Sequence, residues 1–209
     1  MRMFAVILAV AAPAFILLTG EGNMHFVDNA MLPKNGWIAL YDDPKASSLR
    51  PTDITVKADR EMKTVEVDST PPGAVLVMHG IPQLTGGSVK RAVWNRDESL
   101  LRTGDRIAFT LGRDRYTITL HASDTYLKDA RVVLEKAGVS QTLFSHEGEG
   151  DEPHFEILWA GDLDRDGRLD LVMTMSPKYS YYPRTILLSS AAHPGELVHE
   201  VALWQDYSC

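Results

Sequence analysis

The chain has 209 residues, with 21 Lys and Arg against 28 Asp and Glu and a formal net charge of −7 at pH 7. Phosphate binding needs a basic face, so this acidic balance argues against a nucleic-acid partner. The length is sufficient for one sizeable domain, or for two small domains, with a buried core.

The first 20 residues are typical of a secretory signal. Residues 1–3 form a short segment with one basic residue, and Phe4–Leu18 is apolar apart from Pro13. Because a membrane-spanning helix needs about 20 apolar residues, this shorter stretch predicts a cleaved signal peptide over residues 1–20 rather than an anchor. We therefore expect a periplasmic or extracellular protein with no membrane attachment after cleavage.

Two cleavage points are compatible with this signal. Ala12-Pro13-Ala14 has small residues at the required spacing, but cleavage there would leave Phe15–Leu18 exposed at the new terminus. Cleavage after Gly20 avoids that exposure and is the preferred prediction. The mature chain would then begin at Glu21, with 20 Lys and Arg against 28 Asp and Glu, because the signal carries one positive charge.

The remaining residues divide into a lead-in and a β domain. We expect residues 21–52 to be an N-terminal lead-in, since Glu21–Lys34 is polar and shows no clear pattern. Over residues 53–209, β-branched and aromatic residues alternate with polar ones between turn signals, which is typical of strands. The acidic, glycine-rich stretch Gly148–Pro153 is interpreted as an exposed loop, with an interdomain linker as the alternative.

The strands are predicted from this alternation. Residues 107–111 and 116–120 each present apolar side chains on one face, and Gly112–Asp114 is the right length to join them as a hairpin. The other predicted strands are 64–68, 74–78, 89–94, 131–134, 141–145, 155–159, 171–175, 185–188 and 197–204. Residues 123–136 and 197–204 come closest to a helical period. Short strands at intervals of about 8–12 residues predict a mostly β fold, an antiparallel sandwich or barrel-like domain.

The only cysteine is Cys209, the last residue of the sequence. It has no partner within the chain, so we expect a free thiol, a thiol capped by a small molecule, or a disulfide dimer through Cys209.

One nine-residue segment carries metal chemistry. Asp162–Asp170 has aspartates at its first, third, fifth and ninth positions and Gly167 at its sixth. Ca²⁺ takes six to eight oxygen ligands at about 2.3–2.6 Å, and a tight loop can supply them from alternate residues. The predicted ligands are four carboxylates and one backbone carbonyl: Asp162, Asp164, Asp166, Asp170 and the carbonyl of Arg168.

The sequence also predicts how this loop is held. Gly167 permits a left-handed backbone, Leu163 and Leu169 would be buried in the core, and Arg165 and Arg168 would point outward if the carboxylates converge. The flanks are strand-like and the twelfth position lacks the bidentate Glu of an EF-hand, so the predicted geometry is a strand–calcium loop–strand hairpin. Mg²⁺ is less suited because it retains its waters, and an acidic turn without an ion is the alternative.

The pattern Asp-hydrophobic-Asp-x-Asp-Gly-x-hydrophobic-Asp, followed by Leu-Val, resembles the calcium loops of FG-GAP and VCBS repeats, which occur in integrin-type propeller blades. The resemblance implies the same ligand positions in residues 162–170. A propeller needs several four-stranded blades, and the sequence has one such loop, so a whole propeller is not implied. The C-terminal part of the chain also resembles a group of uncharacterised exported bacterial proteins, and this second resemblance implies no activity. It rests on residues 159–161, Ile186–Ser190, Pro194–Val198 and Cys209.

Weaker signals accompany the loop. Tyr179, Tyr181 and Tyr182 could form a platform for a sugar or a peptide, although packing at a strand end is the alternative. They are expected to lie about 20 Å from the ion, across a six-residue strand. His146 and His154 could hold a softer metal, but their spacing matches no zinc site and we expect them to be solvated.

The leading hypothesis is an exported, non-enzymatic, calcium-binding β protein that binds a surface or a protein or glycan partner. Ser189, Ser190 and His193 lack the turn that surrounds a serine nucleophile, so no catalytic residue is assigned. The alternative is an envelope glycan- or peptide-acting hydrolase with a structural calcium, using carboxylates of Glu147–Glu152. A pocket with converged, partly buried carboxylates or histidines would favour the enzyme.

Overall fold

The protein is mostly β. The computed structural model describes residues 14–43, 45–59, 61–95, 99–124 and 126–207. Within these ranges the chain forms antiparallel strands and one short 3-10 helix, η1 (Asn29–Met31), and no α-helix. The predicted mostly β, antiparallel fold is confirmed. In the described part of the chain, no helix has the length and hydropathy needed to span a membrane.

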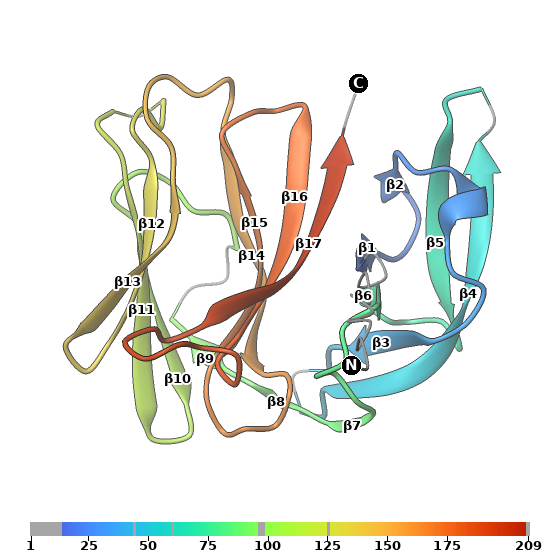
Figure 1. The fold of residues 1–209 in the computed structure, drawn as a ribbon, viewed down its shortest axis with the longest axis horizontal. Helices are drawn as coiled ribbons and strands as arrows, with labels where there is room; N and C mark the ends of the chain where they lie inside the picture. The colour runs from blue at the N-terminus through green and yellow to red at the C-terminus, as the bar shows by residue number, and fades with distance from the viewer. Residues whose placement is uncertain (1–13, 44, 60, 96–98, 125, 208–209) are drawn as a thin grey trace, which may run out of the picture.

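The first sheet is built from the N-terminal strands and curls into a nearly closed barrel (Figure 1). Its strands are β1 (Phe15–Leu18), β2 (Met24–His25), β3 (Trp37–Tyr41), β4 (Ser48–Asp59), β5 (Thr64–Thr70), β6 (Leu76–His79) and β7 (Gly87–Ser88). The order is β1-β6-β3-β4-β5-β2, and β7 pairs with β4. The two ends of this order meet, because Nε2 of His25 lies 2.8 Å from the carbonyl oxygen of Leu18.

The other two sheets have five strands each. The second sheet, in the order β13-β12-β11-β10-β9, contains β9 (Val93–Trp94), β10 (Arg106–Leu111), β11 (Asp114–His121), β12 (Arg131–Lys136) and β13 (Val139–Ser145). The third sheet, in the order β17-β16-β15-β14-β8, contains β8 (Lys90–Arg91), β14 (His154–Asp162), β15 (Asp170–Ser176), β16 (Tyr181–Leu188) and β17 (His199–Tyr207).

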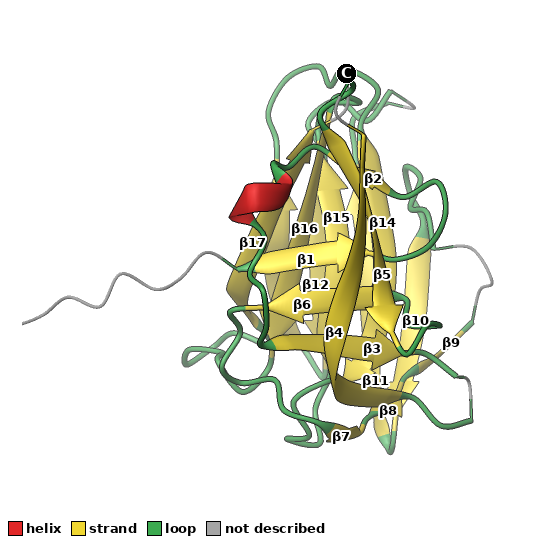
Figure 2. Cartoon of the chain, turned by 90° about the vertical axis from the view of Figure 1, so that its right-hand side faces the viewer, coloured by secondary structure: helices red, strands yellow, loops and turns green. Residues whose placement is uncertain are grey.

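The third sheet is the central layer of the molecule (Figure 1). One face packs against the second sheet in a cluster that includes Phe109 and Phe155. The other face packs against the first sheet in a cluster that includes Leu40 and Trp159. Figure 2 shows β1, β3 and β6 crossing the strands behind them at a steep angle, as in orthogonally packed sheets. Every residue of β15 is therefore buried, which explains the nearly continuous apolar run Leu171–Met175.

The predicted lead-in, residues 21–52, belongs to the first sheet. It supplies β2, β3 and the beginning of β4, and Trp37 is only 2% exposed. The boundary expected at Asp53 falls inside β4, where the strand changes its partner from β3 to β5. Pro51 interrupts the alternation within β4 just before this point, so the predicted β domain starts in the middle of that strand and omits β2 and β3.

The apolar stretch of the predicted signal reaches into the fold. Phe15, Ile16 and Leu17 of β1 are 2%, 0% and 0% exposed. The preference for cleavage after Gly20 over cleavage after Ala14 rested on the exposure of Phe15–Leu18, which does not occur in this fold because β1 pairs with β6 and faces the core. Residues 1–13 of the predicted signal and Cys209 lie outside the described residues.

Most predicted strands are present, and residues 89–94 differ from the prediction of one strand. The hairpin of β10 and β11 forms around a two-residue turn, since Leu111 pairs with Asp114 and Gly112 has φ +62°. Residues 89–94 divide into β8 and β9, which join different sheets. Residues 197–204 contribute to a strand, β17, and no helix forms there.

Candidate metal centre

The acidic loop connects β14 and β15 in the central sheet. Asp162 is the last residue of β14, Asp170 is the first residue of β15, and Gly161 pairs with Asp170. The predicted strand–loop–strand hairpin is therefore confirmed.

Two leucines fix the loop to both faces of the central sheet. Leu163 and Leu169 are fully buried, as predicted, and they enter different clusters. Leu163 packs on the side of the first sheet and Leu169 on the side of the second sheet. Between them, Gly167 has φ +85°, the left-handed conformation that the sequence predicts. Apolar packing on both faces of the central sheet thus holds the loop independently of its charged side chains.

Three of the four predicted carboxylates converge. One oxygen of each of Asp162, Asp164 and Asp166 lies within 4.8 Å of an oxygen of the other two. With Ca²⁺–oxygen distances of about 2.4 Å, ligands on opposite sides of one ion are about 4.8 Å apart, so all three oxygens can reach a single calcium ion.

Asp162 has the least satisfied carboxylate of the three. Its Oδ1 is buried and has no hydrogen-bond partner among the described residues. Burial raises the pKa of Asp162, and the neighbouring charges of Asp166 and Asp164 raise it further. A buried oxygen without a donor is costly unless a cation or a water compensates it, so this atom fits an ion on the carboxylate side of the loop.

Asp164 and Asp166 shape the loop through their own backbone. The N–H of Asp166 donates to Oδ1 of Asp164 at 3.2 Å, and the N–H of Arg168 donates to Oδ1 of Asp166 at 2.8 Å. The prediction that the side chain of Arg168 points outward is wrong, because its Nη2 lies 2.7 Å from Oδ2 of Asp166. The guanidinium offsets part of the loop's negative charge. Coordination by the Arg168 carbonyl stays a prediction.

Arg165 turns away from the carboxylates, as predicted. Its Nη1 donates to the carbonyl oxygen of Gly86 at 2.7 Å, and its Nη2 donates to Oγ1 of Thr85. The guanidinium lies against Gly87, where an added Cβ would collide with Nη1. Arg165 therefore ties the loop to the segment that leads into β7 of the first sheet.

Asp170 lies outside the converging group, unlike the prediction for it. The residue is fully buried, and its Oδ2 accepts from the backbone N–H groups of Leu163 at 2.6 Å and Asp164 at 3.2 Å. Its Oδ1 accepts from the N–H of Ser189 at 2.8 Å. Burial raises the pKa of Asp170 to about 7, against the opposing effect of these hydrogen bonds. Asp170 thus closes the base of the loop, and direct coordination by it stays a prediction.

Two serines complete the site and were not predicted as part of it. The Oγ of Ser189 lies 2.9 Å from Oδ2 of Asp166 and 3.0 Å from Oδ1 of Asp170, and donates to one of them at a time. The hydroxyl of Ser190 donates to Oδ2 of Asp164. Both hydroxyls orient carboxylates, which argues against a nucleophilic role. The register of β15 and β16 brings them there, and no local pattern in the sequence signals it.

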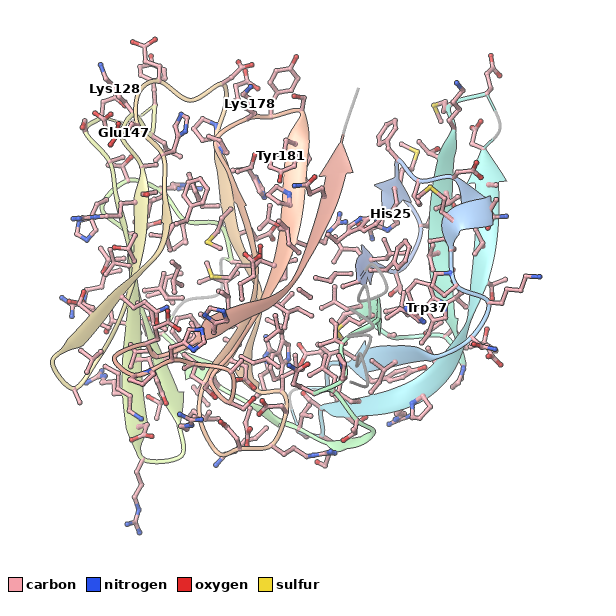
Figure 3. The ribbon with its side chains drawn as sticks, viewed as in Figure 1. His25, Trp37, Lys128, Glu147, Lys178 and Tyr181 are labelled. Atoms are coloured by element: carbon pink, nitrogen blue, oxygen red, sulfur yellow. The ribbon has the colours of Figure 1, made fainter. Side chains whose placement is uncertain are left out.

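The tyrosines lie at the opposite end of the central sheet. Strand β15 runs from Asp170 to Ser176, and Tyr181 follows at the start of β16 (Figure 3). Tyr179 is 46% exposed, and the ring of Tyr182 packs against His154 with centroids 5.4 Å apart. The tyrosines therefore share no site with the acidic loop.

The other weak signals do not combine. Nε2 of His154 lies 3.1 Å from Oε2 of Glu156, and His146 lies near the carbonyl oxygen of Glu149. Neither histidine joins a metal-compatible group among the described residues. Glu147 and Glu152 of the acidic stretch are exposed.

Comparison with known proteins gives no match: no family model fits the chain, and no curated protein or solved structure is significantly similar to it.

Proposed function

We propose that the protein is an exported calcium-binding β protein without enzymatic activity, in which one Ca²⁺ stiffens the central sheet and the opposite end binds a protein or glycan partner. Its place of action would be the periplasm or the extracellular space. The observation that carries the calcium assignment is the convergence of Asp162, Asp164 and Asp166 around the unpaired Oδ1 of Asp162.

The donor set favours calcium over other ions. All converging atoms are carboxylate oxygens, which suit hard cations, and the loop contains no imidazole or thiolate. Mg²⁺ demands near-octahedral geometry and keeps its waters, whereas Ca²⁺ accepts an irregular loop. The resemblance to FG-GAP and VCBS loops supports the same ion.

Calcium at this position would stabilise the contacts between the central sheet and the two sheets that pack against it. The loop contacts the first sheet through Leu163 and Arg165, the second through Leu169, and the end of β16 through Ser189. A divalent cation would offset most of the charge of the three carboxylates and so reduce their mutual repulsion, which would stabilise each of these contacts.

The hydrolase alternative receives less support from the geometry. A catalytic acid needs an apolar setting that raises its pKa, and the glutamates of the Glu147–Glu152 stretch are exposed. The serines beside the loop donate to carboxylates rather than to a histidine. The exposed ring of Tyr179 suits recognition instead, because tyrosine gives rigid contact area with a polar tip.

Calorimetric titration of metal-free protein tests the calcium site. We expect one Ca²⁺ per chain, loss of the binding heat in Asp162→Asn, and unchanged binding in Asp151→Asn, an exposed control on another loop. Mg²⁺ should give much weaker heat. Absence of both heat and a thermal shift at millimolar Ca²⁺, the affinity range of extracellular calcium modules, would return the loop to an acidic turn.

Co-sedimentation with insoluble cell-wall glycan and with envelope protein extracts tests the binding role. Tyr179→Ala should reduce the bound fraction, and Tyr126→Ala, which removes an 80% exposed tyrosine elsewhere, should not. Equal loss in both variants, or in neither, would contradict a platform at Tyr179.

A further inference from the structure

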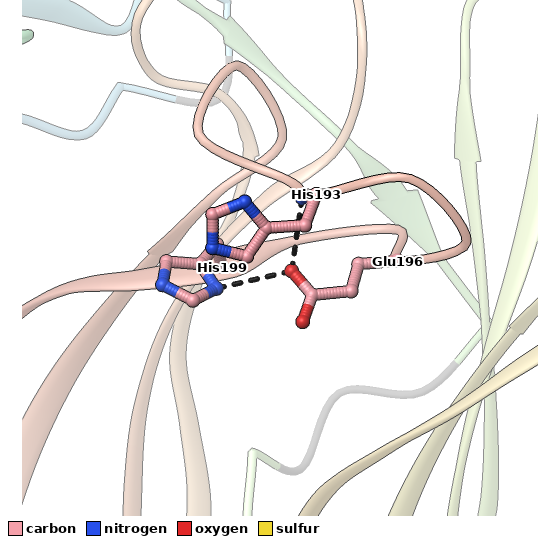
Figure 4. A group of neighbouring side chains, drawn as sticks. All are labelled: His193, Glu196 and His199. Carbon is pink, nitrogen blue, oxygen red and sulfur yellow. Dashed lines mark hydrogen bonds and ion pairs between the residues drawn. The ribbon is translucent and has the colours of Figure 1, made fainter.

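His193, Glu196 and His199 meet where the loop after β16 enters β17 (Figure 4). One ligand atom of each side chain lies within 4.8 Å of those of the other two. The two imidazole rings are 4.3 Å apart between centroids. This cluster is separate from the acidic loop and shares no residue with it.

A tight turn produces the cluster. Residues 193–196 read His-Pro-Gly-Glu, and the N–H of Glu196 donates to the carbonyl oxygen of His193 at 3.0 Å. Gly195 has φ +93°, and proline followed by a left-handed glycine is the signature of a type II turn. The turn places its first and last residues side by side. His199 follows three residues later, at the first position of β17.

Glu196 already connects the members of the cluster. Its Oε2 accepts from the backbone N–H of His193 at 3.0 Å and lies 3.0 Å from Nδ1 of His199. One oxygen of the Glu196 carboxylate is thus held beside the ring of His199 by the backbone of the turn.

The loop that carries these residues is fixed at both ends. Gln141 of β13 accepts from the N–H groups of Leu197 at 2.7 Å and Val198 at 3.1 Å, and donates to the carbonyl oxygen of Val198 at 2.8 Å. Val198 is fully buried. At the other end, Ser189 and Ser190 are bound to the acidic loop. The backbone is therefore preorganised, and only side-chain rotations separate the cluster from a closed ligand set.

We propose that His193, Glu196 and His199 form a second metal site that takes Zn²⁺ or a similar borderline divalent cation. Two imidazoles and one carboxylate are ordinary zinc ligands, at about 2.0–2.2 Å from the ion. A tetrahedral ion with such bonds separates its ligand atoms by about 3.4 Å, which is close to the present Glu196–His199 contact. His193 is exposed and can rotate to close the set.

The site differs in chemistry from the acidic loop. Imidazole nitrogens favour zinc, copper and nickel, whereas all-oxygen loops favour calcium and magnesium. Three protein ligands leave the fourth tetrahedral position to water or to a group from a partner. The cluster would thus hold an accessible zinc ion with one exchangeable position, beside the start of β17 at the edge of the central sheet.

Zinc titration of the metal-free protein tests this site. We expect one Zn²⁺ per chain and, in His193→Ala, His199→Ala and Glu196→Gln, a loss of affinity larger than the about 10–100-fold that follows removal of an outer-shell partner. His121→Ala, an exposed histidine on β11, is the matched control and should bind as the wild type does. Asp162→Asn should also retain zinc, because its carboxylate belongs to the other site.

A measurement on the unchanged chain covers the case in which a variant fails to fold. Zinc should protect His193 and His199, but not His121, from diethylpyrocarbonate, as read by mass spectrometry of peptides. Co²⁺ in place of Zn²⁺ should give the intense visible absorption of a tetrahedral site. Zinc affinity unchanged in the cluster variants, or the same modification of all three histidines with and without zinc, would overturn the proposal.

Discussion

The hydroxyl oxygen of Ser189 lies 3.0 Å from Oδ1 of Asp170, in the buried base of the acidic loop. The backbone N–H of Ser189 donates to the same carboxylate oxygen, and two further N–H groups donate to its other oxygen. Asp170 therefore organises the loop in the absence of any ion, whereas Asp162 keeps an unpaired oxygen. The aspartates of one motif thus differ in role: Asp170 holds the base of the loop through backbone donors, and Asp162 presents an oxygen without a donor.

Replacement of Asp170 should destabilise the metal-free protein. Asp170→Asn keeps the volume but turns an amide NH₂ group toward buried donors, and leaving such donors unsatisfied costs about 1–3 kcal/mol. We expect a loss in unfolding free energy of at least that size in urea titrations without metal. Asp164→Asn is the comparison, and should change metal-free stability by less, since Asp164 is only partly buried. Equal losses would show that the two carboxylates do not differ in role.

Calcium should raise the melting temperature. An ion that binds only the folded state adds about 2.7 kcal/mol at a concentration one hundred times its Kd, which is about 5–11 °C for a chain of this size. Asp162→Asn should abolish most of this rise while leaving the strands on either side intact by circular dichroism. Scanning calorimetry with and without Ca²⁺ measures both effects, and an equal rise in the variant would place the ion elsewhere.

The fold was predictable where the chain is locally regular. Alternation indicates most strands of the second and third sheets, because half-buried strands have a polar face. Alternation does not indicate a strand around Pro51, nor does it indicate β1. The apolar residues of β1 are buried in the core, and their sequence pattern is that of a secretory signal. The assignment of β8 and β9 to different sheets depends on long-range pairing that a window of residues does not contain.

The sequence predicted the three carboxylates that converge in the candidate site, but it also predicted Asp170 among them and did not predict the residues that support them. The spacing of the aspartates in the sequence was sufficient to predict that the carboxylates of Asp162, Asp164 and Asp166 converge. Ser189 and Ser190 reach them across the β15–β16 register, from residues more than 18 positions away in sequence. The His193 cluster is different, since its members are three residues apart. The proline and glycine between the first two could have indicated the turn that joins them.

Acid should remove a small part of the stability through Glu156. The hydrogen bond from His154 holds the pKa of Glu156 below its ordinary value of 4.5, and the Ser99 hydroxyl adds to this effect. Because the pKa is lower in the folded state, ionised Glu156 stabilises the fold above about pH 4.5, and this contribution is lost as the pH falls through the folded-state pKa.

Urea midpoints across this range check the effect. The stability difference between wild type and Glu156→Gln should shrink as the pH falls below about 4.5, with a size under about 1 kcal/mol because the side chain is partly exposed. Glu149→Gln, at an exposed position, is the control variant. A difference that grows on acidification would contradict the sign of the pKa shift.

The buried position of β1 leads to a prediction about processing. Phe15, Ile16 and Leu17 are almost fully buried, and burial of each such side chain contributes about 1.5–3 kcal/mol. A chain that begins at Glu21 would lose these contacts and uncover the edge of β6, with which β1 pairs. Cleavage after Ala14 would keep the whole strand, so we expect the mature protein to begin at Phe15.

Two measurements check this prediction. Mass spectrometry of the protein from its native cells should find Phe15 at the terminus, and an intact Met1 would contradict export. Purified chains that begin at Phe15 and at Glu21 should differ in unfolding free energy by more than about 3 kcal/mol, since three buried apolar side chains are removed. If the shorter chain is as stable as the longer one, β1 is dispensable and cleavage after Gly20 is favoured over cleavage after Ala14. If it is much less stable or insoluble, the apolar segment after Ala14 is part of the mature fold.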